Sequence, residues 1–182
     1  MNLPTTILGL LSWKSASGYD LKRIISGSQI FYWSGNNNQI YKSLLELHKE
    51  GLVTAQVQLQ ESLPAKKVYA ITEKGLSELQ RGLLTAPEAP QLHKSFLIQL
   101  AWAEILSDAE VLDLLNKYES EIIDCLHLVR GRIARPDNSP ARSKRERYLW
   151  QRITENLVVT YQTELDWVRQ TQAAFHEGKF SG

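Results

Sequence analysis

The chain has 182 residues, of which 43% are hydrophobic and 23% charged, with a formal net charge of +1 at pH 7. This composition is typical of a soluble globular protein of one domain or two small ones. No apolar run approaches the roughly 20 residues that a membrane-spanning helix needs, and we read no signal peptide at the N-terminus. The lone Cys125 excludes an internal disulfide and provides no metal-ligand cluster. We therefore expect a cytoplasmic protein without a metal or other cofactor.

The charge is divided unevenly along the chain. Residues 1–84 carry 9 Lys and Arg against 6 Asp and Glu, whereas residues 85–182 carry 12 against 14. A mild excess of positive charge in the first half is compatible with contact to phosphates, although it does not require one.

Two short helices open the chain. Leu3 to Ser12 groups its apolar residues as a mostly buried first helix. Ser17 and Gly18 break this pattern before a second helix, which runs from Tyr19 to about Ser26.

A third helix is predicted from Gln39 to Glu50, after a polar turn of Ser, Gly and Asn residues. Ile40, Leu44 and Leu47 recur at the spacing of one helical stripe, and Gly51 is placed to end the helix. The Asn run before the helix is suited to cap its first backbone N–H groups. Its opposite face is polar and basic, so it is either an ordinary solvated surface or one that enters a DNA major groove.

After Gly51 the apolar period changes to two, which predicts a β-hairpin. Val53, Ala55, Val57 and Leu59 alternate with polar residues as a half-buried strand. A turn at Glu61 to Ala65 leads to a second strand from Lys67 to Ile71, and Thr72 caps a helix that runs to about Leu84. Helix, hairpin and helix in this order form a winged helix-turn-helix.

Three segments of this region resemble a known family: GYDL from Gly18, QIYKSLLELHKEGLV from Gln39 and KKVYAITEKG from Lys66. They are similar to the motif blocks of PadR-family transcriptional regulators, most closely to those of the AphA-like members. The resemblance implies a mainly α protein with an N-terminal winged helix-turn-helix domain and a C-terminal helical dimerisation domain. Its function would be sequence-specific binding of double-stranded DNA as a homodimer on a pseudo-palindromic operator.

The candidate DNA contacts lie in the turn, on the third helix and in the wing. Asn and Gln side chains pair with adenine, and Lys pairs with guanine or a phosphate. The residues that we assign to DNA are Ser34, Asn37, Asn38, Gln39, Tyr41, Lys42, Lys66 and Lys67. The wing tip departs from the family pattern because it contains no Arg, and Leu45 stands on the outward face where many relatives have a basic residue.

Residues 85–91 contain two prolines and form the linker between a domain of residues 1–84 and one of residues 92–182. The second domain is predicted to contain helices at Leu92 to Leu106, Asp108 to Arg135 and Ala141 to about His176. The last two helices are too long to cover their apolar stripes among themselves, so a second copy of the chain is the simplest cover. We assign the dimer interface to Leu126, Val129, Ile153, Leu157, Tyr161, Leu165 and Val168. A compact monomer is the alternative.

Some members of the PadR family bind aromatic or drug-like effectors near the dimer interface, although the AphA-like members give no such expectation. The resemblance therefore implies a small aromatic effector, with Trp102, Trp150 and Trp167 as its candidate site. Aromatic residues at helical spacing are more often core, which is the competing interpretation. The four histidines are scattered, and no nucleophile, phosphate loop or metal pair is visible, so we expect no enzyme and no catalytic residues. The remaining rival is a winged helix that binds another protein and not DNA.

Overall fold

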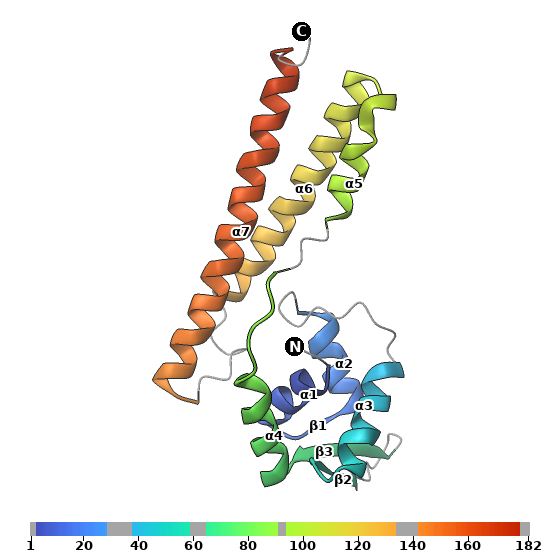
Figure 1. The fold of residues 1–182 in the computed structure, drawn as a ribbon, viewed down its shortest axis with the longest axis vertical. Helices are drawn as coiled ribbons and strands as arrows, with labels where there is room; N and C mark the ends of the chain where they lie inside the picture. The colour runs from blue at the N-terminus through green and yellow to red at the C-terminus, as the bar shows by residue number, and fades with distance from the viewer. Residues whose placement is uncertain (1–2, 29–37, 59–64, 91–93, 134–141, 179–182) are drawn as a thin grey trace. The chain divides into compact units, whose positions relative to one another are not determined.

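The computed structural model describes residues 3–28, 38–58, 65–90, 94–133 and 142–178. The chain divides into two compact units, Met1–Pro90 and Gln91–Gly182. Figure 1 shows the first unit as helices around a small sheet and the second as two long helices with a short one beside them. This arrangement confirms the mainly α class, and none of the helices described is long and apolar enough to cross a membrane.

The first unit is a winged helix. Its elements are α1 (Leu3–Leu11), β1 (Ala16–Ser17), α2 (Gly18–Ser26), α3 (Asn38–Lys49), β2 (Val53–Gln58), β3 (Lys66–Ile71) and α4 (Glu73–Leu83). The three strands form an antiparallel sheet in the order β1-β3-β2. The core joins apolar residues of α1, α2 and α3 to the base of the sheet, among them Ile7, Leu8, Leu21, Leu44 and Val53.

The short strand β1 was not predicted from the sequence. Ala16 pairs with Tyr69 and Ser17 with Val68, so that the segment read as a simple break adds a third strand to the wing. Ser17 also caps α2: its hydroxyl accepts the N–H of Asp20 at 3.2 Å, and the Asp20 carboxylate accepts the N–H of Ser17 at the same distance. This reciprocal pair is a capping box.

The capping carboxylate of Asp20 also binds a lysine of the wing. Lys66 Nζ lies 2.8 Å from Asp20 Oδ2, which joins β3 to the start of α2. This lysine, together with the Ser17 hydroxyl, lowers the pKa of Asp20 to about 2. The folded protein therefore holds Asp20 ionised well below the pH at which an ordinary carboxyl takes up a proton.

The predicted end of α3 is confirmed. Gly51 has φ of +71°, a conformation that suits glycine, and its N–H donates to His48 O at 3.0 Å. The N–H of Leu52 donates to Leu47 O at 2.9 Å, which completes a Schellman motif. The chain thus turns sharply from α3 into β2.

The start of α4 is fastened to this turn. As predicted, Thr72 is the N-cap, accepting the N–H of Gly75 at 3.0 Å, while its hydroxyl donates to Gly51 O at 2.9 Å. Lys74 Nζ donates to Glu50 O at 2.7 Å. A Cβ on Gly75 would lie 2.1 Å from Leu52 O, so only glycine permits this approach of α4 to the turn.

The outer half of the first wing strand is less buried than predicted. Val53 is buried and Ala55 partly buried, but Val57 is 66% exposed. The alternation was read correctly as a strand, and its burial decreases from Val53 towards Val57. Leu59 lies outside the described residues.

The second unit contains α5 (Ser95–Ala101), a 3₁₀ turn η1 (Ala103–Ile105), α6 (Asp108–Ile133) and α7 (Lys144–His176). The single helix predicted from Leu92 to Leu106 is wrong, because α5 ends at Ala101, with Trp102 as its C-cap, and η1 follows. Consequently Phe96 faces the core, whereas Leu97 is 40% and Ile105 89% exposed. Ser107 precedes α6 and forms a capping pair with Glu110, whose carboxylate accepts the N–H of Ser107 at 2.8 Å.

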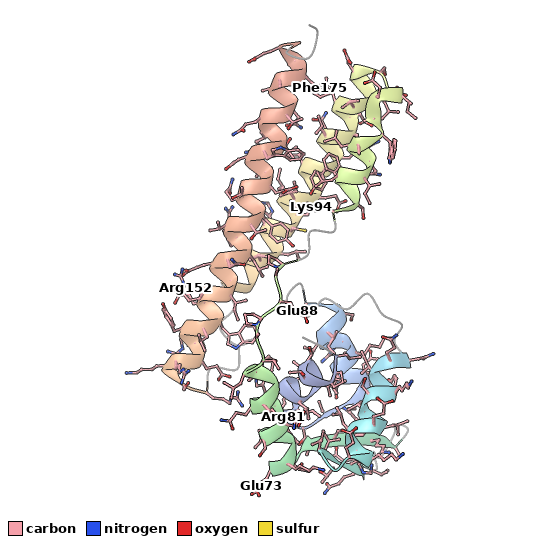
Figure 2. The ribbon with its side chains drawn as sticks, viewed as in Figure 1. Glu73, Arg81, Glu88, Lys94, Arg152 and Phe175 are labelled. Carbon is pink, nitrogen blue, oxygen red and sulfur yellow. The ribbon has the colours of Figure 1, made fainter. Side chains whose placement is uncertain are left out.

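The core of the second unit is built where α5, α6 and α7 meet. Figure 1 shows α6 and α7 side by side, and Leu115 and Val168 are among their fully buried residues. The ring of Phe96 stacks on Tyr118 with centroids 3.7 Å apart and meets Trp167 edge-on at 6.3 Å. At the margin of this core, Lys94, labelled in Figure 2, forms an ion pair with Glu164.

We expect the variant Gly75→Ala to be less stable than the native protein by about 1 to 3 kcal/mol, because the added methyl group would push Leu52 and α4 apart. Equilibrium unfolding in urea measures this difference. Gly9→Ala is the matched control, since a Cβ at Gly9 in α1 meets nothing within 4 Å. The control should gain roughly 0.5 to 1 kcal/mol from the better helix propensity of Ala. Equal stability of the two variants would contradict the tight approach.

The Asp20–Lys66 pair predicts a stability that depends on acid pH. The pKa of Asp20 is lowered from 3.8 to about 2 on folding, so the stabilisation is complete above about pH 4 and is lost as the pH falls through about 2. Allowing for the partial exposure of both side chains, we expect Asp20→Asn to cost about 1 to 2 kcal/mol at pH 7. Unfolding free energies of both proteins should converge near pH 2. If the difference in unfolding free energy between the two proteins did not change with pH, the negative charge of Asp20 would not contribute to stability.

Candidate nucleic-acid interface

The helix α3 presents one polar and basic face to solvent. Ile40, Leu44 and Leu47 are buried at 3%, 0% and 4% exposure, as the sequence predicted. The opposite side of α3 carries four exposed residues at a spacing of one to three turns: Asn38, Lys42, Leu45 and Lys49. This exposed face, called here the α3 face, has the donors and cations that base edges and phosphates require.

Leu45 lies in the middle of the α3 face with 58% of its surface exposed. It stands between Lys42 and Lys49 on the helix, and Gln39 and Glu46 flank this row on one side. An exposed leucine among cations offers an apolar contact, for which a thymine methyl group is suitable in a major groove.

Tyr41 sits at the edge of the α3 face and is held against α2. A Cβ on Gly18 would lie 2.5 Å from Cε1 of Tyr41, so the ring packs on the bare backbone of Gly18. The side chain is nevertheless 45% exposed. Tyr41 therefore fixes the spacing between the first residue of α2 and α3 while keeping a surface open to a ligand.

The two wing lysines, which the sequence treats alike, differ in the structure. Lys66 is bound by Asp20, whereas Lys67 is exposed with its Nζ 5.5 Å from the ring centroid of Tyr69. Successive residues of a strand point to opposite faces, so adjacent lysines meet different neighbours. Lys67 is the better placed of the two for a phosphate.

Two predicted DNA contacts, Ser34 and Asn37, lie outside the described residues. The capping role of Asp20 was missed, although Ser17 followed three positions later by an acidic residue is a sequence signal for a capping box. The pairing of Asp20 with Lys66 had no such signal, because 46 positions separate the two residues.

The residues assigned to dimerisation fall into two groups. Leu126, Val129, Leu165 and Val168 are buried within a single copy of the chain, at 5% exposure or less. Leu157 and Tyr161 are partly buried and Ile153 is 37% exposed. The first four thus belong to the core between α6 and α7, and a partner would have to contact other residues.

Other apolar side chains of the second unit are exposed. Five of them lie within ten positions on α5, η1 and the residues beside them; they are Leu97, Ile98, Trp102, Ile105 and Leu106. We call this set the α5–η1 apolar face. Ile98, Trp102 and Ile105 are 65%, 74% and 89% exposed, which is unusual for such side chains in a monomeric protein.

The three tryptophans assigned to an effector do not share one site. Trp150 and Trp167 are 17 positions apart on α7, which corresponds to about 25 Å of helix. Trp102 is mostly exposed on the α5–η1 apolar face, and Trp167 packs edge-on against Phe96.

A polar cluster lies beside Phe96 in the second unit. Tyr118 Oη donates to Glu164 at 2.8 Å, and burial together with this carboxylate raises the pKa of Tyr118 well above its usual value. Burial and the neighbouring Cys125 likewise raise the pKa of Tyr161. Among the described residues no three His, Cys, Asp or Glu side chains are grouped to hold a metal ion.

Comparison with known sequences identifies relatives of this chain. Residues 7–81 match the family described as "Transcriptional regulator PadR-like family". The chain is 32% identical over 127 residues to the negative transcriptional regulator PadR of Bacillus subtilis, an alignment that covers 67% of this chain and 70% of that protein.

Comparison with solved structures extends the similarity of fold to the second unit. Bacillus subtilis PadR in complex with operator DNA has a TM-score of 0.80 at 24% identity, covering 95% of this chain and 98% of that chain. The same protein in complex with p-coumaric acid gives 0.74 at 23% identity, covering 96% and 98%. The Vibrio cholerae virulence activator AphA gives 0.66 at 24% identity, covering 97% and 99%. The resemblance drawn from the three sequence motifs is thus confirmed, and the chain belongs to the PadR-like family of transcriptional regulators.

Proposed function

We propose that this protein is a sequence-specific DNA-binding regulator that acts as a homodimer on a pseudo-palindromic operator. The observation that carries the proposal is the α3 face, where Asn38, Lys42 and Lys49 are exposed on a helix whose other side is fixed in the core. A helix of this kind fits a major groove. The operator complex of the related Bacillus subtilis PadR supports this use of the fold.

In this proposal the first residues of α3 read bases. Asn38 and Gln39, both exposed at the N-terminal end of the helix, are suited to bidentate pairing with adenine. Lys42 follows one turn after Asn38 and binds guanine or a phosphate. Leu45 would meet a thymine methyl group.

The wing contributes less charge than its sequence suggests. Lys67 is assigned to a phosphate, whereas Lys66 is assigned to holding the wing on α2 through Asp20. A lysine is a weaker ligand than arginine for a narrow minor groove. We therefore expect the wing to position the protein on the DNA and α3 to supply most of the specificity.

The dimer is proposed to form through the α5–η1 apolar face. The side chains of this face are exposed in the single chain, whereas Leu126, Val129, Leu165 and Val168 are already covered. Burying exposed apolar surface is the main driving force of protein association. A two-fold dimer of winged units would then match two half-sites separated by one helical turn of DNA or a multiple of it.

The proposal includes a response to a small aromatic effector and excludes an enzymatic role. The complex of Bacillus subtilis PadR with p-coumaric acid supports the class of effector. In this chain the cluster of Phe96, Tyr118 and Trp167, with Glu164 and Lys94 beside it, is the best candidate for its site. The regulator would act in the cytoplasm, where its operator lies.

We expect the native protein to bind a duplex from upstream of its own gene more tightly than a scrambled duplex, at both low and near-physiological salt. Lys42→Glu should weaken this binding by about 10- to 100-fold, because it replaces a base or phosphate contact by a repulsive charge. Fluorescence anisotropy of the labelled duplexes measures both effects. Lys117→Glu, an equal change of charge at an exposed position of α6, is the control and should bind as the native protein does.

The same assay tests the roles of the two wing lysines, the effector and the alternative of a protein-binding winged helix. Lys67→Gln should reduce the dependence of log K on log salt by about 0.9, the loss of one phosphate contact, whereas Lys66→Gln should leave that slope unchanged. Release of the duplex by p-coumaric acid would support the effector. Equal weakening by Lys42→Glu and Lys117→Glu would show that the loss follows from net charge and not from the α3 face. Failure of both duplexes to bind at low salt would favour a winged helix that binds another protein.

We expect the double variant Ile98→Glu/Ile105→Glu to be a monomer at concentrations where the native protein is a dimer. The substitutions place two negative charges in the proposed interface, where burying them is unfavourable. They leave the core intact because Ile98 and Ile105 are exposed in the single chain. Analytical ultracentrifugation measures the dissociation constant, which should rise at least about 100-fold. Leu84→Glu, at an 80% exposed site of the first unit, is the control. A dimer that persists in the double variant would place the interface elsewhere.

A further inference from the structure

The N-terminal end of α7 carries a concentration of positive charge that the proposed function does not use. Five of the twelve Lys and Arg residues of positions 85–182 lie between Arg142 and Arg152, with Glu146 as the one carboxylate among them. The remaining seven share their half of the chain with thirteen carboxylates. This end of α7 is therefore a basic site in an otherwise acidic unit.

Three of these cations pair with no carboxylate among the described residues. Arg142 is bound to Glu146, with Nη2 and Oε1 2.7 Å apart, and Arg152, labelled in Figure 2, pairs with Glu155. Lys144, Arg145 and Arg147 are exposed, and no ion pair to them is found in the part of the chain that the structure describes. With the 60% exposed Tyr148 they form what we call the α7 basic patch.

The position of the patch on the helix is electrostatically unfavourable for folding. The N-terminal end of a helix carries a partial positive charge, which favours carboxylates and disfavours cations. Ser143 caps α7 by accepting the N–H of Glu146 at 3.0 Å, and Glu146 is the one acidic residue of the first turn. Lys144, Arg145 and Arg147 are thus placed against the helix dipole, and no carboxylate of the described residues pairs with them.

The geometry of α7 gathers the patch on one side. The patch residues Lys144, Arg145, Arg147 and Tyr148 cover slightly less than half of the circumference of α7, with Tyr148 near the middle of that arc. Trp150, on the other side, is partly buried. The exposed side therefore offers ammonium, guanidinium and phenol groups together, which are the donors that proteins use on phosphates.

We propose that the α7 basic patch binds the DNA backbone outside the base pairs that the winged units contact, an inference that rests on the proposed function. Duplex DNA is the polyanion that the winged units bring to this protein, so a weak second contact on the same duplex benefits from a high effective concentration. Lys144, Arg145 and Arg147 would displace counterions condensed on the DNA when they meet its phosphates, and this release compensates for their unfavourable position on the helix. The patch adds affinity without adding sequence preference.

The experiment uses the full-length protein and two duplexes centred on the operator found by footprinting. The short duplex ends at the limits of the footprint of the winged units, and the long one extends about 20 base pairs further on each side, roughly two helical turns. We expect the native protein to bind the long duplex with the steeper salt dependence. The triple variant K144Q/R145Q/R147Q should lose this extra slope, about 0.9 for each phosphate contact, and roughly tenfold or more in affinity for the long duplex at low salt.

The short duplex and a second variant keep the outcomes distinct. Native and triple-variant proteins should bind the short duplex equally, and R145K/R147K, which keeps the charge, should bind the long duplex as the native protein does. Equal binding of the long duplex by the native protein and the triple variant overturns the α7 contact while leaving the regulator intact. Equal losses on both duplexes overturn the assignment to flanking DNA. Failure of the native protein to bind the short duplex rejects the proposed function itself.

Discussion

The orientation of α3 depends on the close approach of Gly75 to the carbonyl oxygen of Leu52. That carbonyl also accepts the N–H of Thr72 at 3.1 Å, so the end of α3, the start of β2 and the start of α4 meet at one backbone group. Gly51 makes the turn that brings Leu52 there. Because these contacts are between backbone groups, they fix the helix directions with little freedom, and the α3 face has one orientation relative to the wing.

A second constraint, electrostatic this time, joins the wing to α2. Asp20 takes part in the capping box at the start of α2 and also forms an ion pair with Lys66. One carboxylate therefore stabilises the helix end and neutralises one lysine of the wing. The described part of the wing then retains Lys67 as its exposed lysine. Because the net charge is only +1, the exposed cations Lys144, Arg145 and Arg147 of α7, which pair with no carboxylate of the described residues, are a substantial part of the positive surface.

Local signals made much of the fold predictable. The stripe of Ile40, Leu44 and Leu47, the cap at Gly51 and the N-cap at Thr72 are patterns within about one or two turns of chain, and α3 was placed to within one residue. The two-residue strand β1 was not predictable in this way, because it exists only through its pairing with β3. The different roles of Lys66 and Lys67 also depend on distant neighbours, so the candidate site could be predicted as a region and not residue by residue.

The predicted dimer interface shows where reasoning from periodicity ends. Apolar spacing reports correctly that α6 and α7 each carry a long stripe, and with 26 and 33 residues the two helices are comparable in length. Packed side by side, they bury Leu126 and Val129 against α7 without a second copy of the chain. Exposed apolar side chains remain on α6 and α7, where Leu128 and Val159 are 62% and 64% exposed. Others lie on α5 and η1, where the helix breaks at Trp102 and where Ile98 and Ile105 stay outside the core. An apolar stripe in the sequence thus indicates how much apolar helix surface must be buried. Whether another helix of the same chain or a second copy buries it depends on the tertiary structure.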